Sequence, residues 1–285
     1  EEMLRALIER GTLAEEDSRW ALTVPMAEVA IPDGVHAVIA ARVDALPPAE
    51  KQALQDATLQ GKDFFLGALR FVADENHVDE SVKALLQKDL VIRKRRSTLA
   101  GDEEFTFRHI LIRDVAYTMI PKARRWTKHA RLAEWMNRMV GDRPAEWADV
   151  IAHHWLQVVA LRQELGLPPD ANAREQAITN LLLAGERAAR VYANTTALDH
   201  FTRALELEPA PEQRLQAFLG RGEVWFLLGQ YDQARENFAA VRALAPETGT
   251  RRWEAVALDR LGFSFRQQDQ IAAALEHQQA ALAIS

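Results

Sequence analysis

Two short motifs in this 285-residue sequence contain residues that could support catalysis. Gly61 and Lys62 could belong to a phosphate-binding loop, but that loop needs a glycine where Asp56 stands. Ser264 could lie on a nucleophile elbow, but Arg266 replaces the glycine that closes such an elbow. We therefore expect no catalytic residue in this sequence. Any enzyme activity would belong to a longer parent protein.

Metal chemistry is supported no better. The chain contains no cysteine, which excludes disulfides, thiolate zinc sites and cysteine nucleophiles. Asp149 and His153 are four residues apart and would share a helix face, but two ligands without a third are weak evidence for a metal. We expect no metal site, and we interpret His153 and His154 as histidines on a helix surface or between helices.

The elements that would carry any function are mainly helical. Leu and Ala are abundant while Gly (13) and Pro (11) are modest, which favours helices. From about residue 177 a pattern recurs at spacings of 37 and 40 residues. Each unit has a glycine followed twelve residues later by an alanine, and the first two units add a phenylalanine and a proline: Gly185, Ala197, Phe201, Pro209; Gly222, Ala234, Phe238, Pro246; Gly262, Ala274.

This pattern predicts a helical hairpin repeated three times and resembles the tetratricopeptide repeat, over residues 177–285 with the third unit truncated. The small residues would let paired helices approach closely, and Phe201 and Phe238 would fill the space between neighbouring units. Such hairpins stack into a solenoid whose first helices line a groove for a protein or peptide partner. The residues expected to line this groove are Glu186, Arg190, Glu223, Phe226, Asp259, Arg260, Phe263 and Arg266. They could equally form an inert solvated face or a packing surface for further repeats.

Residues 37–121 have a different pattern. Helices are expected over 47–60, 64–74 and 78–90, followed by strands over 90–97 and 104–109 around a turn that contains glycine. Three helices followed by a hairpin are typical of a winged-helix domain.

Residues 122–168 then predict a helical connector of two amphipathic helices. The residues expected to line these helices are Leu132, Trp135, Met136 and Met139 on the first, and Val150, Trp155, Val158 and Val159 on the second.

The net charge of −6 hides a basic window. Residues 88–131 contain twelve basic and five acidic residues, a net charge of +7. A winged helix with a basic wing invites an alternative function as a DNA-binding transcriptional regulator. The third helix argues against direct DNA binding, because it opens with Asp79 and Glu80 where a base-reading helix presents cations or amides. The basic window could instead be a solvated face, or could face nucleotide phosphates or an acidic neighbouring domain.

Three phrases carry a wider resemblance: ARVDALP (41–47), FRHILIRDVAY (107–117) and HARLAEWM (129–136). Together they resemble the bacterial signal-transduction ATPases with numerous domains (STAND) attached to class III adenylate or guanylate cyclases or to LuxR-type regulators. The resemblance implies a regulatory segment of a longer signalling protein. Residues 1–36, which open on EEMLRALIERG, would be the end of an ATPase module in the same chain. ATP or ADP would bind that module, and this segment would hold no cofactor of its own.

The resemblance also implies a nucleotide contact. In this class a winged-helix histidine contacts the β-phosphate of bound ADP and holds the inactive state. Phe107-Arg108-His109-Ile110-Leu111 occupies the matching place, with Arg108 and Ile110 where related proteins have Met and Asp. His109 could equally cap the junction between the wing and the next helix without any ligand. The sequence shows no membrane span and no signal peptide, so a cytoplasmic protein is expected.

Overall fold

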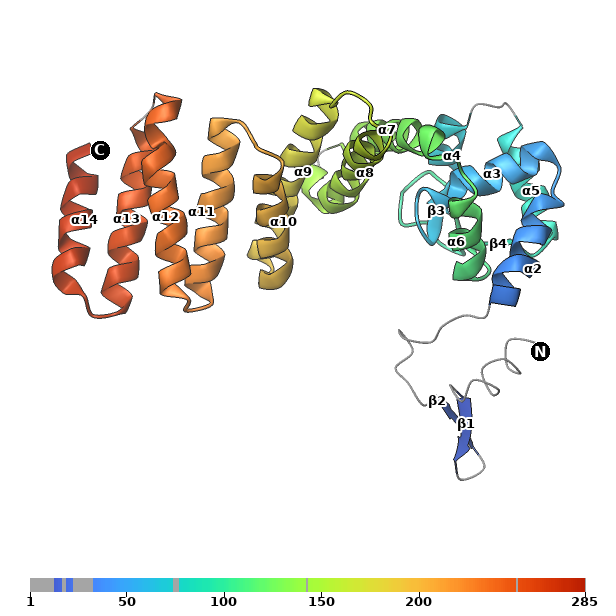
Figure 1. The fold of residues 1–285 in the computed structure, drawn as a ribbon, viewed down its shortest axis with the longest axis horizontal. Coiled ribbons are helices and arrows are strands. Elements are labelled where there is room, and N and C mark those ends of the chain that lie inside the picture. The colour runs from blue at the N-terminus through green and yellow to red at the C-terminus, as the bar shows by residue number, and fades with distance from the viewer. Residues whose placement is uncertain are drawn as a thin grey trace. The chain divides into compact units, whose positions relative to one another are not determined.

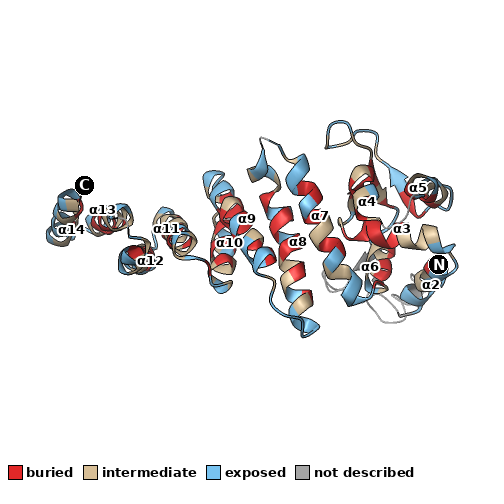
Figure 2. Cartoon of the chain, turned by 90° about the horizontal axis from the view of Figure 1, so that it is seen from above, coloured by how far each residue is buried: buried red, intermediate tan, exposed pale blue. Residues whose placement is uncertain are grey.

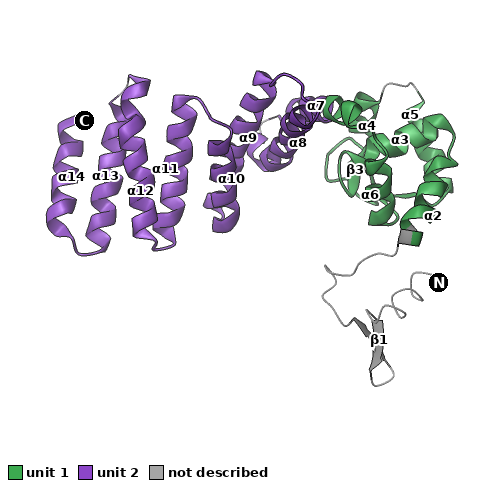
Figure 3. Cartoon of the chain, viewed as in Figure 1, with its two compact units in different colours: residues 1–128 green, residues 129–285 purple. Residues whose placement is uncertain are grey.

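The computed structural model describes residues 13–16, 19–22, 33–73, 77–141, 143–249 and 251–284, and these are mainly helical (Figure 1). The chain divides into an N-terminal unit, Glu1–Lys128, and a C-terminal unit, His129–Ser285 (Figure 3). Residues 1–11, with which the expected end of an ATPase module opens, lie outside the described residues. A short antiparallel hairpin that the sequence did not predict joins β1 (Leu13–Glu16) to β2 (Arg19–Leu22).

The rest of the N-terminal unit contains helices and a three-stranded antiparallel sheet in the order β3-β5-β4. The helices are α2 (Asp33–Asp44), α3 (Pro48–Thr58), α4 (Leu66–Val72), α5 (Val78–Gln87) and α6 (Ile110–Thr118). The strands are β3 (Asp63–Phe65), β4 (Val91–Arg93) and β5 (Glu104–Phe107). The three helices and the hairpin lie where the sequence predicts them. The sequence did not predict strand β3, because its three residues are too few to show the alternation of a strand.

The core of this unit forms around the sheet. The Phe64 ring of β3 lies 5.4 Å from that of Phe105 and 5.5 Å from that of Phe107, measured between ring centroids. Leu54 of α3 and Leu85 of α5 are completely buried in the same cluster. The helices therefore pack on the sheet through their apolar faces, and the loop between β4 and β5 lies mostly at the surface.

The connector consists of α7 (Lys122–Met139) and α8 (Pro144–Glu164). Leu132, Trp135 and Met136 are buried as expected, but Met139 is 44% exposed because it is the last residue of α7. The expectation for Val150, which is 37% exposed, is also wrong. The buried stripe of α8 follows Ala148, Ile151, Ala152, Trp155 and Val158, a helical period that places Val150 to one side.

Three helical hairpins follow in the C-terminal unit (Figure 1). They are α9 (Ala171–Arg190) with α10 (Asn194–Glu206), α11 (Pro211–Leu227) with α12 (Tyr231–Leu244), and α13 (Arg252–Gln267) with α14 (Ile271–Ile284). A short 3-10 helix, η2 (Ala245–Thr248), follows α12. The expected fold class, mainly helical with a small sheet and tetratricopeptide-type hairpins, is confirmed.

The recurring glycines lie where paired helices cross. A Cβ atom at Gly185 would lie 2.8 Å from the Phe201 ring, and one at Gly222 would lie 2.6 Å from the Phe238 ring. Phe201 also packs against Gly220 of the next hairpin, so its ring fills the space between two units as expected. In Figure 2 the residues buried along these helices face the neighbouring helices.

Candidate functional site

The eight residues predicted to face a partner all lie on the first helices of the three hairpins. Because α9 contacts α11 and α11 contacts α13, these helices form one continuous surface. All eight side chains are exposed or half-buried. We call this set the A-helix face: Glu186 and Arg190 on α9, Glu223 and Phe226 on α11, and Asp259, Arg260, Phe263 and Arg266 on α13.

The structure brings three of the charged residues together. The Arg260 guanidinium donates to Glu223 on the neighbouring helix and, at 3.1 Å, to Asp259 beside it. Two carboxylates of the A-helix face therefore share one internal cation, which leaves this group with one net negative charge. This pairing fixes the position of α13 on α11 and reduces the charge that Glu223 and Asp259 can offer to a partner.

The structure also brings the aromatic residues together. The ring centroids of Phe226 and Phe263 lie 5.2 Å apart, and the Arg266 guanidinium lies 4.4 Å above the centre of the Phe263 ring. Both rings are half-buried and Arg266 is exposed. An arginine stacked on an aromatic ring keeps its N–H donors available at the edge of the guanidinium. Phe226, Phe263 and Arg266 therefore form an apolar patch bordered by a cation.

Sequence reasoning missed one member of this patch. Tyr231, the first residue of α12, is half-buried, and its ring centroid lies 5.4 Å from that of Phe226. The signal available in the sequence was an aromatic residue two positions after the turn residue Gly229. It lies on the second helix of its hairpin, whereas the repeat pattern predicts a groove on the first helices.

Glu186 and Arg190 lie apart from the charged and aromatic groups of α11 and α13. Both are exposed and lie one helical turn apart on α9. Among the described contacts, none joins either side chain to the other six residues of the A-helix face. Of the eight predicted residues, the structure therefore brings together those on α11 and α13.

His109 lies where the sequence places it, between β5 and α6. It is the residue that precedes α6, its backbone is extended, and its exposed side chain makes no capping hydrogen bond. Arg108 is also exposed and lies 3.9 Å from Asp89. The nearby Arg113 points elsewhere, because its Nε donates to the Thr58 carbonyl oxygen at 3.2 Å.

The basic residues of β4 and of the loop that follows it are partly paired with acids of the same unit. Arg93 pairs with Glu103, and Lys94 pairs with Glu104 and, at 3.1 Å, with Asp63. Hydrogen bonds to Glu104 and Asp63 raise the pKa of Lys94. Arg95 and Arg96 are exposed beside these pairs.

The α5 helix carries one exposed cation, Lys83, but its first turn is acidic. Arg70 donates to both carboxylate oxygens of Asp79 at 2.9 and 2.8 Å, which lowers the pKa of Asp79. Lys88, just after α5, pairs with Glu50. The exposed Glu80 remains at the start of the helix, where it would repel a phosphate backbone.

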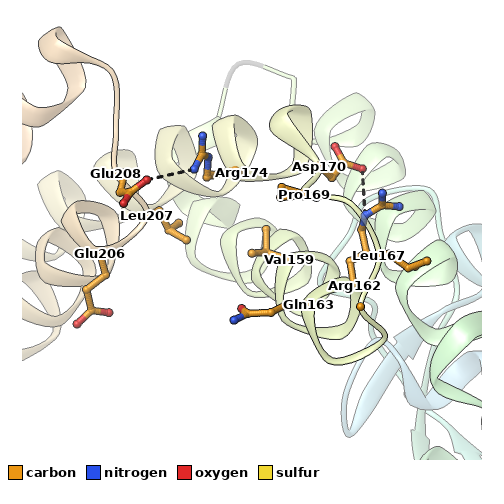
Figure 4. A pocket seen from close by; sticks show the side chains of 11 residues that line it. Val159, Arg162, Gln163, Leu167, Pro169, Asp170, Arg174, Glu206, Leu207 and Glu208 are labelled. Carbon is orange, nitrogen blue, oxygen red and sulfur yellow. Dashed lines mark ion pairs between the residues drawn. The ribbon is translucent and has the colours of Figure 1, made fainter.

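A shallow pocket of about 450 Å³ lies where the α8–α9 loop meets the end of α10 (Figure 4). Two ion pairs cross it, Arg174 with Glu208 at 3.6 Å and Arg162 with Asp170 at 3.9 Å. Asp170 also accepts a hydrogen bond from the Ala173 N–H and so caps α9. The charged groups of this pocket therefore stabilise the entry into α9.

Other kinds of site find no support in the described part of the chain. No group of three or more His, Asp or Glu side chains in the described ranges could hold a metal ion, and Asp149 instead lies 3.5 Å from His200. In the same ranges, no helix combines the length and the apolar character needed to cross a membrane.

Comparison with known proteins identifies the repeats. Residues 213–285 match the tetratricopeptide repeat family, which makes α11–α14 tetratricopeptide repeats. A search of curated protein sequences gave no significant match. The first hairpin lies outside the matched range but has the same contact between glycine and phenylalanine, at Gly185 and Phe201.

Two solved structures are among those similar to this chain. One is MamA, 16% identical, with a TM-score of 0.34 and an alignment that covers 57% of this chain and 91% of MamA. The other is a STAND protein with a tetratricopeptide repeat sensor from Pyrococcus horikoshii, 14% identical, with a TM-score of 0.31. That alignment covers 90% of this chain and 53% of the archaeal chain.

Proposed function

We propose that this chain is a regulatory and protein-interaction segment of a multidomain signal-transduction ATPase. Its tetratricopeptide repeats bind a protein partner or signal, and residues 37–121 act as a winged helix that gates the nucleotide state of an ATPase module in the same protein. The presence of the repeats, a class that generally binds proteins, supports the first part. The order helix, strand, helix, helix, hairpin and the three sequence phrases support the second.

The observation that carries the binding function is the patch of Phe226, Phe263 and Arg266. Half-buried aromatic rings next to an arginine are the side chains that contribute most to protein interfaces. The rings are held against each other before a partner arrives, so binding loses little side-chain entropy. The patch bridges α11 and α13, which suits an extended segment laid across successive repeats.

The charges around the patch indicate the chemistry of the partner. Arg260 already holds Glu223 and Asp259, whereas the contact described for Arg266 is with the Phe263 ring. An aromatic or aliphatic side chain would cover Phe226 and Phe263, and a neighbouring carboxylate would pair with Arg266. The partner segment therefore combines an apolar side chain with an adjacent acidic residue.

The test measures binding of fluorescent peptides to the full 285-residue chain. The peptides carry one aromatic residue followed by aspartate, lysine or serine. We expect the aspartate series to bind best, and Phe263→Ala to weaken it by roughly 30-fold, the effect of losing about 2 kcal/mol at a hot spot.

Charge reversal sharpens this test. Arg266→Glu should shift the preference from the aspartate to the lysine peptides, because it inverts the charge at the edge of the patch. Arg242→Glu, a matched exposed change on α12, should leave the preference unaltered. Equal binding of all three series, or an Arg266→Glu variant that keeps the original preference, would refute the binding proposal.

The gating proposal concerns His109 and Arg108. The exposed His109 ring stands at the positive N-terminal end of α6, where an anion is stabilised, and so these residues fit a phosphate. The nucleotide would supply that phosphate, and the His109 ring would bind it. The proposal requires a GxxxxGKS or GxxxxGKT loop in the ATPase module of the parent protein.

The gate is tested by ADP retention in the purified parent protein. His109→Ala should speed ADP release, while His77→Ala, an exposed histidine just before α5, should not. Unchanged ADP release and unchanged basal ATP hydrolysis in the His109→Ala protein would refute the assignment.

A further inference from the structure

Two histidines that the proposed function does not use are buried side by side in the C-terminal unit. His129 on α7 and His154 on α8 are each 1% exposed, and their ring centroids lie 5.2 Å apart. Their Nδ1 atoms face each other at 3.0 Å, a hydrogen-bond distance. These two side chains join the helices of the connector.

The proton count of this contact is restricted by its geometry. A hydrogen bond between two Nδ1 atoms needs one atom to carry a proton and the other to accept it. If both rings become imidazolium, both Nδ1 atoms carry protons, and two N–H groups point at each other. The contact therefore tolerates one Nδ1 proton and is lost when a second arrives.

The surroundings of His154 disfavour the second proton. Its Nε2 atom is buried without a hydrogen-bond partner. Burial, followed by the nearby His129 and His153, holds the pKa of His154 well below its ordinary value. All three influences act against the charged form of this ring.

Among the described contacts, none brings a carboxylate to His154. On α7 the residue before His129, Lys128, directs its ammonium to Asp56. From α9, Ile178, Leu181 and Leu182 form an apolar cluster with Ala152 of α8. From α10, the buried His200 faces Asp149, whose carboxylate is thereby directed to another histidine.

We propose that the His129–His154 pair makes the contact between α7 and α8 an acid-sensitive switch. The contact is closed while the pair holds a single proton between the two Nδ1 atoms, and it opens when both rings are protonated. α7 begins in the N-terminal unit and ends in the C-terminal unit, so acidification acts on a helix that belongs to both.

The sign of the pH effect follows from proton binding. A histidine whose pKa is lower in the closed state binds more protons in the open state, so acid favours opening. The stabilisation of the closed contact by uncharged His154 is fully present above the ordinary histidine pKa of about 6.5, and it declines as the pH falls below that value. Each pH unit below that value should raise the open population by up to about tenfold per proton taken up.

The experiment is hydrogen exchange measured by mass spectrometry on the full chain at pH 7.5, 6.5 and 5.5, with exchange rates corrected for intrinsic pH dependence. We expect peptides from residues 129–139 and 151–158 to lose protection at pH 5.5, while peptides from α11–α14 keep theirs. His154→Asn, which keeps a polar group near the Nδ1 position but does not titrate, should remove this pH response. His77→Asn, which replaces an exposed histidine just before α5, should retain it.

A spectroscopic readout keeps the proposal testable if His154→Asn does not fold. Nitrogen-15 NMR of the histidine rings should show one Nδ1–H and one Nε2–H tautomer for the buried pair at pH 7.5, and His129→Asn should remove one of these signals. Unchanged protection between pH 7.5 and 5.5, or both rings titrating freely near pH 6.5, would overturn the switch.

Discussion

At the scale of single residues, small side chains decide how closely the repeat helices approach. A Cβ at Gly262 would lie 2.8 Å from Gln278, and similar clashes occur at Gly185 and Gly222. The phenylalanine opposite the first two glycines then occupies the space that the missing side chain leaves. None of these three glycines has a positive φ, so backbone conformation does not require glycine there. The close contacts with the neighbouring helix do.

Replacing one of these glycines should therefore destabilise the repeats. Gly222→Ala places a methyl group 2.6 Å from the Phe238 ring. We expect a loss of about 1–3 kcal/mol in the free energy of unfolding, typical of an overpacked core. Urea unfolding followed by circular dichroism measures this loss.

The matched control for that prediction is Gly34→Ala in α2. No heavy atom lies within 4 Å of the position that a Cβ would take at Gly34. This change should be neutral or stabilising by up to about 1 kcal/mol, because alanine favours a helix over glycine. A Gly222→Ala protein as stable as the Gly34→Ala protein would contradict the packing argument.

At the scale of elements, a buried ion pair holds the start of α7 on α3 within the N-terminal unit. The Lys128 Nζ lies 2.8 Å from Asp56 Oδ2, with side-chain exposures of 3% and 0%. Gln52 donates to the other carboxylate oxygen at 2.8 Å. A buried pair of this kind costs desolvation energy, and its removal on one side leaves an uncompensated charge.

We expect Asp56→Ala to lower the free energy of unfolding by about 3–5 kcal/mol, because Lys128 would lose its buried counter-ion. The double variant Asp56→Leu with Lys128→Met should recover most of that loss, since two apolar side chains need no counter-charge. Urea unfolding of the two variants measures the difference. A double variant as unstable as Asp56→Ala would show that the unpaired lysine is not the cause of the loss.

At the scale of the whole molecule, two compact units lie on one chain. Units with separate cores need not unfold together, so a single two-state transition is not expected. Scanning calorimetry should resolve two transitions, and Asp56→Ala should lower only the one that belongs to the N-terminal unit, by roughly 10 °C or more. A single transition, lowered as a whole by Asp56→Ala, would show that the two units unfold as one.

The sequence alone determined the features that depend on local spacing. The period of glycine, alanine and phenylalanine predicted the hairpins, because residues three or four apart share a helix face and small residues mark close crossings. The positions of the aromatic and charged residues on the first repeat helices followed from the same period. Within residues 37–121, three helices were predicted from their apolar faces, and the hairpin was predicted from alternating apolar and polar residues around a turn that contains glycine.

Only the tertiary structure decided which of those residues meet. Arg260 and Glu223 are 37 positions apart, His129 and His154 are 25 apart, and Lys128 and Asp56 are 72 apart. The sequence analysis also did not predict the three-residue strand β3 or the exposure of Val150. A helical period states which face a side chain occupies, but the partner on that face depends on how distant helices cross. That crossing is set by packing across the whole unit, which no local pattern contains.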